Sequence, residues 1–305
     1  MNGHSSLEPW REPPRGAADH RGDGSKQEPQ TPPFPRSVDE DSSKTITSRR
    51  RSPLKFFLLV FALSIPFALI GAVTGLQLFP GIPVVALAFA CPAMAAAILS
   101  YRENGTTAVA QLLRRSFDYQ RIGAKVWYVP IILLMPSVYA LTYELMRVMG
   151  LPLVTPQLPV LAAVVLLLAF FIMALGEELG WMGYAIDPMQ GRWNAFQAGI
   201  LLGLVWAGWH TLAIVQDGQS PAFIAWAWLD MVGIRVLAVW LYNNTGKSVF
   251  AISLLHVTGN LKWILFPGGF SYDAQLIESL IVAVAAAIVT VVWGPRTLAN
   301  PMCRF

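Results

Sequence analysis

Long apolar stretches separated by turn residues make up most of the chain from residue 55 onwards. A helix that crosses a membrane needs about 20 mostly apolar residues. Eight stretches meet or approach this length: 55–77, 82–101, 126–148, 157–176, 195–215, 221–242, 248–266 and 275–294. Proline, glycine and asparagine mark the breaks between them, as at Pro80-Gly81 and Pro267-Gly268. The pattern predicts an all-α, polytopic membrane helix bundle with about eight transmembrane helices.

The first 52 residues have a different composition. Eight of the 18 acidic residues precede Pro53, in a stretch rich in Pro, Ser and Arg. Such a segment cannot bury enough apolar surface to offset the entropy lost on ordering. We therefore expect a disordered cytoplasmic tail, residues 1–52, before a transmembrane domain at 53–305.

Composition and charge support a membrane protein and give it an orientation. The chain is 55% hydrophobic and 13% charged, whereas soluble domains carry roughly 25% charged residues. Lys and Arg occur in alternate inter-span segments, whereas 78–81, 149–156, 216–220 and 267–274 contain neither. Because basic loops stay in the cytoplasm, the sequence predicts a multi-pass integral membrane protein with both termini cytoplasmic.

Residue usage bears on the source and the partners. Arg outnumbers Lys by 16 to 6, which favours a GC-rich genome and a bacterial plasma membrane. The expected partners are the lipid bilayer and a peptide or membrane-protein substrate. No nucleic acid is expected, and the oligomeric state stays open.

Ionisable residues inside the apolar segments are the candidates for function, because charge at membrane depth is costly. They are Glu144, Glu177, Glu178, His210, Asp230, Arg235, His256, Lys262 and Glu278. Trp206 precedes His210 by four residues, and Asn260 follows His256 by four, so each pair shares a helix face.

Two carboxylates, two imidazoles and an amide suit the activation of water. A carboxylate takes the proton, and imidazoles hold a metal or stabilise charge on a carbonyl group. Other interpretations are open: the Glu pair could end a span at the headgroups, or the set could relay protons in a transporter. The chain shows no inverted repeat, which argues against a transporter.

Three motifs together resemble the CAAX protease and bacteriocin-processing (CPBP, Abi-type) family of intramembrane proteases. The first is the pair Glu177-Glu178, followed by Trp181 and Gly183. The second is an aromatic residue, usually Phe in the family and Trp206 here, four residues before His210. The third is His256 with Asn260 four residues later. The resemblance covers roughly residues 55–295.

The resemblance implies an intramembrane endopeptidase that hydrolyses a peptide bond near the membrane. Glu177 would be the general base, with Glu178 as its supporting acid. His210 and His256 would bind the water or a metal, and Asn260 would stabilise the oxyanion. A Zn²⁺ ion held by Glu177, His210 and His256 would make the enzyme a metalloprotease, whereas a metal-independent, glutamate-type protease is the other form. A prenylated substrate is not expected in a bacterium.

Met182 departs from the first motif, where the family has Arg. Three explanations are open. Arg192 or Arg235 supplies the charge from elsewhere, the pH profile is altered, or the protein is a catalytically inactive membrane scaffold or immunity protein on the same fold. We favour the first, because the residues tied to the chemistry are intact.

Overall fold

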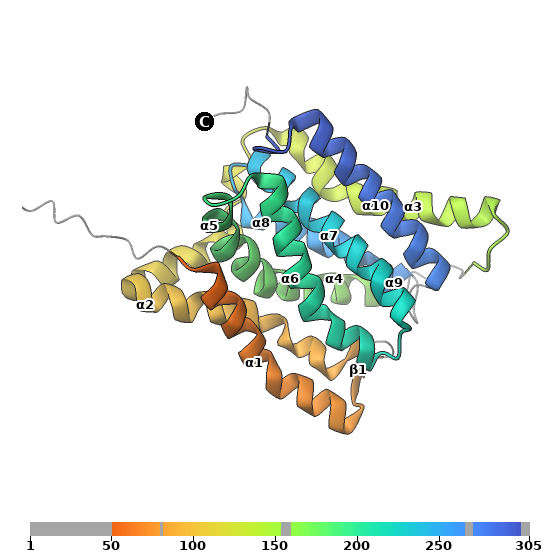
Figure 1. The fold of residues 1–305 in the computed structure, drawn as a ribbon, viewed down its shortest axis with the longest axis horizontal. Coiled ribbons are helices and arrows are strands. Elements are labelled where there is room, and N and C mark those ends of the chain that lie inside the picture. The colour runs from red at the N-terminus through yellow and green to blue at the C-terminus, as the bar shows by residue number, and fades with distance from the viewer. Residues whose placement is uncertain (1–50, 80–81, 154–159, 266–270, 300–305) are drawn as a thin grey trace, which may run out of the picture. The chain divides into compact units, whose positions relative to one another are not determined.

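The computed structural model describes residues 51–79, 82–153, 160–265 and 271–299, all of them within the unit Thr47–Phe305. The predicted tail, 1–52, lies outside the described residues apart from its last two. The long helices are α1 (Pro53–Thr74), α2 (Cys91–Arg114), α3 (Tyr128–Val148), α4 (Val160–Gly180), α6 (Ala195–Gln216), α7 (Pro221–Asn244) and α10 (Tyr272–Trp293). Figure 1 shows them as one helical bundle.

Shorter elements connect the long helices. Helical segments are η1 (Val84–Ala90), η2 (Arg115–Phe117), η3 (Tyr119–Arg121), η4 (Lys125–Trp127), η5 (Trp181–Ala185), α5 (Ile186–Gln190), α8 (Val249–Gly259) and α9 (Leu261–Leu265). A small antiparallel pair, β1 (Gln77–Phe79) and β2 (Ile82–Pro83), follows α1. The η5 segment is a π-helix, a form that frequently occurs at functional sites.

Within the described residues, seven helical stretches are long and apolar enough to cross a membrane. Their outward faces carry large exposed apolar side chains, such as Val73 and Val291, each 84% exposed. Apolar surface of this kind needs lipid around it in a natively folded protein. The predicted polytopic helix bundle is confirmed.

The predicted span 248–266 is the exception. Helix α8 has 11 residues, which at about 1.5 Å per residue covers roughly half of a hydrocarbon core about 30 Å thick. The chain then turns at Asn260 and continues as the short α9. In place of the seventh predicted span, the structure therefore has a broken helix. The sequence could not show this, because a broken helix buried in protein is as apolar as a true span.

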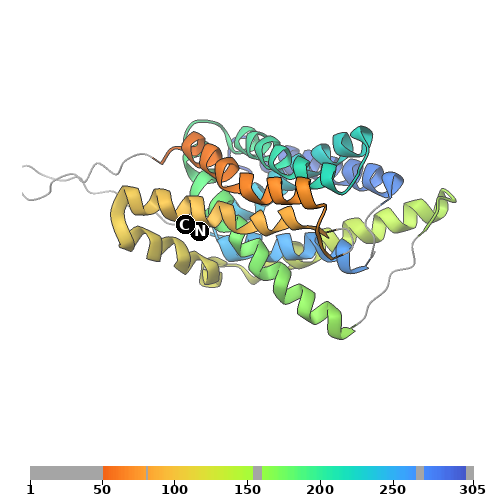
Figure 2. The same ribbon diagram turned by 90° about the horizontal axis from the view of Figure 1, so that it is seen from below.

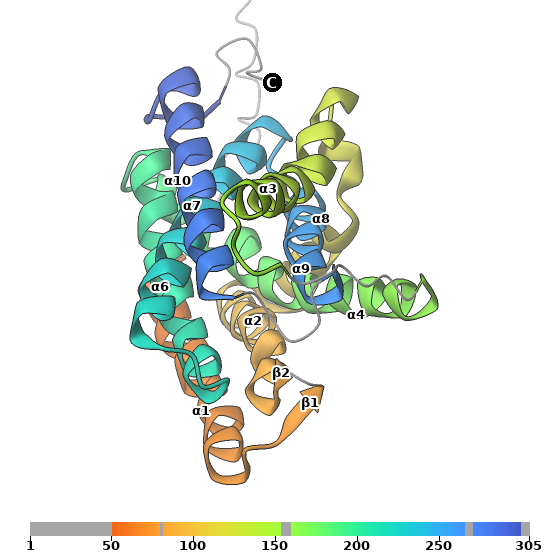
Figure 3. The ribbon, with the colours of Figure 1, turned by 90° about the vertical axis from the view of Figure 1, so that its right-hand side faces the viewer.

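Helix α8 lies inside the bundle. It packs against α3, α4 and α7, and Figure 3 shows it beside α3 and above α9. Helices α6 and α7 form the most extensive helix pair, and α10 packs on α7. Helix α4 runs obliquely beneath α8 in Figure 2, where α4 is the bright green helix. Irregular backbone at membrane depth is tolerated where protein or a cavity surrounds it, as here.

Candidate active site

The Glu pair lies at the end of α4, where glycine allows unusually close helix packing. A Cβ atom at Gly180 would come within 2.6 Å of the backbone of Pro92, and one at Gly176 within 2.9 Å of the Phe89 carbonyl oxygen. These contacts press one face of α4 against the η1–α2 segment. Glu177 and Glu178 project from the other side and are 5% and 1% exposed. They do not end a span at the headgroups.

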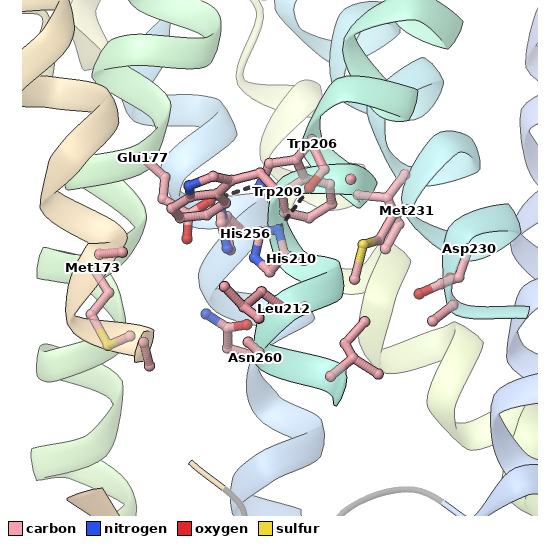
Figure 4. Close-up of a pocket in the computed structure, with 18 of the residues that line it drawn as sticks. Met173, Glu177, Trp206, Trp209, His210, Leu212, Asp230, Met231, His256 and Asn260 are labelled. Atoms are coloured by element: carbon pink, nitrogen blue, oxygen red, sulfur yellow. Dashed lines mark hydrogen bonds between the residues drawn. The ribbon is translucent and has the colours of Figure 1, made fainter. Parts of the chain in front are cut away.

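The indole of Trp206 is the centre of the site. Its Nε1–H donates to Glu177 Oε2 at 2.8 Å. Its ring contacts both imidazoles edge-to-face, with centroid distances of 4.6 Å to His210 and 5.8 Å to His256. Helices α4, α6 and α8 thus bring these residues together (Figure 4).

Hydrogen bonds fix the orientation of both histidines. His210 Nδ1 lies 3.0 Å from the Trp206 carbonyl oxygen, and His256 Nδ1 lies 2.8 Å from Glu178 Oε1. A carbonyl or carboxylate oxygen only accepts, so each Nδ1 carries the proton. The Nε2 atom of each ring is left for a second partner. A carboxylate behind a histidine is an arrangement that orients the ring for catalysis.

Arg235 completes the site. Its Nη1 donates to Glu178 Oε2 at 2.8 Å, and its guanidinium carbon lies 3.9 Å from the centre of the Trp206 ring. Both side chains of the ion pair are buried. Arg235 supplies the positive charge that Met182 does not provide. Arg192 lies exposed between α5 and α6. Of the two arginines considered from the sequence, the structure selects Arg235.

These residues line a cavity of about 720 Å³. Asn260 ends α8 and faces this cavity beside the imidazoles (Figure 4). Most of the lining is apolar and comes from α1, α4, α6 and α7. All five residues proposed from the motifs, Glu177, Glu178, His210, His256 and Asn260, therefore share one cavity.

A second buried ionic group lies on the wall of the same cavity. Lys262 Nζ is 3.5 Å from Glu278 Oε1, and Glu278 is fully buried. Lys262 therefore does not extend to the outer surface, as a lysine near a helix end commonly does. Asp230 is buried nearby on the cavity wall. Arg235, five residues further along α7, pairs with Glu178 instead. Glu144 and Arg147 form the exposed surface pair that their spacing indicates.

Among the described residues, no three His, Cys, Asp or Glu side chains come together in a way that could hold a metal ion. Both oxygens of Glu178 and one oxygen of Glu177 already accept hydrogen bonds from protein groups. The donor set proposed for zinc, Glu177, His210 and His256, does not fit a metal in this geometry. Zinc remains only what the family resemblance implies.

Asp118 is a site residue that the sequence did not reveal. Its carboxylate accepts from Ser248 Oγ at 2.7 Å and from the backbone N–H groups of Val249 and Phe250 at 3.3 and 3.0 Å. It thereby caps the N-terminus of α8, the helix that carries His256. At the other end of α8, the Tyr139 hydroxyl donates to the Gly259 carbonyl. Contacts made 120 or more residues apart leave no local signal in the sequence.

We expect Asp118→Ala to lower the free energy of unfolding by about 1–2 kcal/mol, because a capping carboxylate at a helix N-terminus is lost. Cleavage should fall as well, since His256 moves with α8. Thermal unfolding in detergent and a cleavage assay measure the two effects. Glu144→Ala removes an exposed carboxylate and serves as the control. Equal unfolding temperatures for the two variants would contradict the capping role.

The fold and cavity define a multi-pass helical membrane protein with a buried cluster of carboxylates and imidazoles. Comparison with known proteins shows which proteins the chain resembles. Residues 159–262, which include all five motif residues, match the family model for the Type II CAAX prenyl endopeptidase Rce1-like proteins. The chain is also 27% identical over 268 residues to a protein of Methanococcus maripaludis named CAAX prenyl protease 2, covering 80% of this chain and 95% of that relative. Both matches are to CAAX proteases, in agreement with the resemblance inferred from the motifs.

Proposed function

We propose that the protein is an intramembrane endopeptidase in which Glu177 activates a water molecule. The observation that carries this proposal is the placement of Glu177, His210 and His256 around the single indole of Trp206. With Oε2 held by Trp206, the second oxygen of Glu177 is left to accept a proton from water. A positioned carboxylate base of this kind contributes about 10²–10⁴-fold to a rate.

The other residues take supporting roles in the proposed reaction. Water, deprotonated by Glu177, attacks the carbonyl carbon of the scissile peptide bond. Asn260 and the Nε2 side of the imidazoles stabilise the negative charge that develops on the carbonyl oxygen. Glu178 keeps His256 oriented through its Oε1. The proton taken by Glu177 passes to the leaving nitrogen, so that the bond breaks and the base is restored.

The cavity supports an apolar substrate. Its size and mostly apolar lining suit a peptide or membrane-protein segment that enters from the bilayer. The relative from Methanococcus maripaludis is named for prenyl substrates, and a cavity of this kind would accept a prenyl chain too. A prenylated peptide is therefore the second substrate class to test.

The orientation is part of the proposal. Arg51 and Arg115 both reach the Gly183 carbonyl, and Arg115 also contacts the backbone of Lys247. Basic residues that precede α1, follow α2 and follow α7 thus meet at one end of the bundle, next to the π-helix η5. Because basic segments stay on the cytoplasmic side, this end would face the cytoplasm.

Identification of cleaved protein termini in cells tests the function. Cells with the wild-type protein are compared with cells that carry Glu177→Ala or His210→Ala, at equal protein levels. In cells with the wild-type protein, we expect cleaved termini of membrane proteins that are absent from cells with either variant. If both variants keep every cleavage, the catalytic proposal is wrong and the scaffold interpretation, which Met182 favoured, takes its place.

Chelation tests the metal hypothesis. We expect cleavage by the purified protein to persist in 1,10-phenanthroline, because the described residues form no set of three metal ligands. Metal analysis of the wild-type protein and of His256→Ala is made in parallel. Activity that is lost with the chelator and restored by Zn²⁺ would contradict this expectation and support the zinc set.

A further inference from the structure

Arg235 is a buried arginine whose contacts lead to both acids of the site. The side chain is 2% exposed, in the middle of α7, a helix long and apolar enough to span the membrane. A cation at this depth is costly unless it is paired and used. Its direct partner is Glu178, through the Nη1–Oε2 bond of 2.8 Å.

The second contact of Arg235 reaches Glu177 through an intermediate. The guanidinium carbon lies 3.9 Å from the centre of the Trp206 ring. A cation stacked on an indole at this distance is attracted to the ring face. The same indole donates its N–H to Glu177 Oε2 at 2.8 Å. The plane of Trp206 therefore connects the cation to the proposed base.

The guanidinium is held by these two contacts. Its Nε and Nη2 atoms are buried and have no hydrogen-bond partner among the described residues. A guanidinium carries five N–H donors, so most of its bonding capacity is unused. Its orientation therefore depends on the bond to Glu178 and on the stacking on Trp206. Changing either contact should disturb the other.

We propose that Arg235 and Trp206 act as one positioning unit for the two acids. Arg235 orients Glu178 directly, and it orients Glu177 by fixing the plane of Trp206. The inference rests on the proposed protease function and concerns the same site. It also connects two departures of this chain from the family motifs. The first is the indole of Trp206 in place of the usual phenylalanine, which has no N–H. The second is the uncharged, fully buried Met182 in place of the usual arginine.

A double-mutant cycle tests the unit. The variants are Arg235→Lys, Trp206→Phe and both together, because lysine keeps the buried charge and phenylalanine keeps the ring. The probe is an internally quenched peptide that the wild-type protein cleaves, selected from a mixed-sequence library. Arg192→Met, which removes an exposed arginine, is the matched control and should keep wild-type kinetics.

We expect each single variant to lose about 10–100-fold in kcat with a small change in KM, since displacements near 1 Å can cost about 100-fold. The double variant should lose much less than the product of the two single losses, because each change disturbs the same unit. Losses that multiply fully, or single variants with wild-type kcat, would overturn the proposal.

A readout without substrate separates this inference from the protease function. ¹⁵N NMR of imidazole-labelled protein in detergent reports which ring nitrogen of His256 carries the proton, with His256→Asn providing the assignment. In Arg235→Lys, we expect the Nδ1–H signal of His256 to shift, because Glu178 loses its fixed position. An unchanged signal would contradict the inference. A wild-type protein that cleaves no peptide would instead contradict the proposed function.

Discussion

Glu177→Gln is expected to reduce the cleavage rate by about 10²–10⁴-fold, the range that a positioned general base contributes. The substitution is nearly isosteric. The glutamine carbonyl oxygen can still accept the Trp206 N–H bond that Glu177 Oε2 accepts at 2.8 Å. The change therefore removes the proposed base and keeps the geometry around the indole. The loss should appear in kcat, because the base acts in the chemical step.

Purified wild-type protein and Glu177→Gln are compared on the same quenched peptide at saturating concentration. Glu144→Gln changes an exposed acid of α3 that pairs with Arg147 and controls for the loss of a carboxylate. Thermal unfolding confirms that the variant remains folded. A folded Glu177→Gln protein with wild-type kcat would exclude Glu177 as the base.

Glu178→Ala is expected to have the largest effect on stability. It leaves the Arg235 guanidinium buried without a counter-ion, and breaking a buried ion pair from one side costs about 3–5 kcal/mol. It also removes the oxygen that holds His256 Nδ1 at 2.8 Å. We therefore expect a lower unfolding temperature in detergent together with loss of cleavage.

The double variant Glu178→Ala/Arg235→Met distinguishes charge from packing. With the cation removed as well, neither charge of the Glu178–Arg235 ion pair remains, and replacing both partners with apolar groups is often neutral. Its unfolding temperature should return toward that of the wild type, while cleavage stays lost. A double variant less stable than Glu178→Ala alone would contradict the ion-pair explanation.

The sequence predicts the spans well, because lipid requires each crossing segment to be a continuous apolar helix. It also predicts the motif residues, since costly ionisable groups stand out in such segments. The sequence left two arginines, Arg192 and Arg235, as possible sources of the positive charge that Met182 does not provide. Arg235 lies 57 residues away, and the ion pair that links α4 to α7 leaves no mark in either segment.

Three features of the structure are not predicted by the sequence, and for the same reason. The broken helix at 248–266 has the hydropathy of a full span, because protein encloses it. Lys262 has a place in the sequence that suits a surface lysine, yet it pairs with Glu278 inside the bundle. The motif requires only an aromatic ring, so it does not predict the N–H bond from Trp206 to Glu177. Each depends on contacts between helices distant in the chain.

The short length of α8 has a consequence for biogenesis. A segment of 11 residues is too short to partition into the bilayer as a stable span by itself. It needs the surfaces of α3, α4 and α7, which precede it in the chain, as a template. His256 would thus reach its place only after the earlier helices have assembled. A partly synthesised chain would therefore lack the complete cluster of carboxylates and imidazoles.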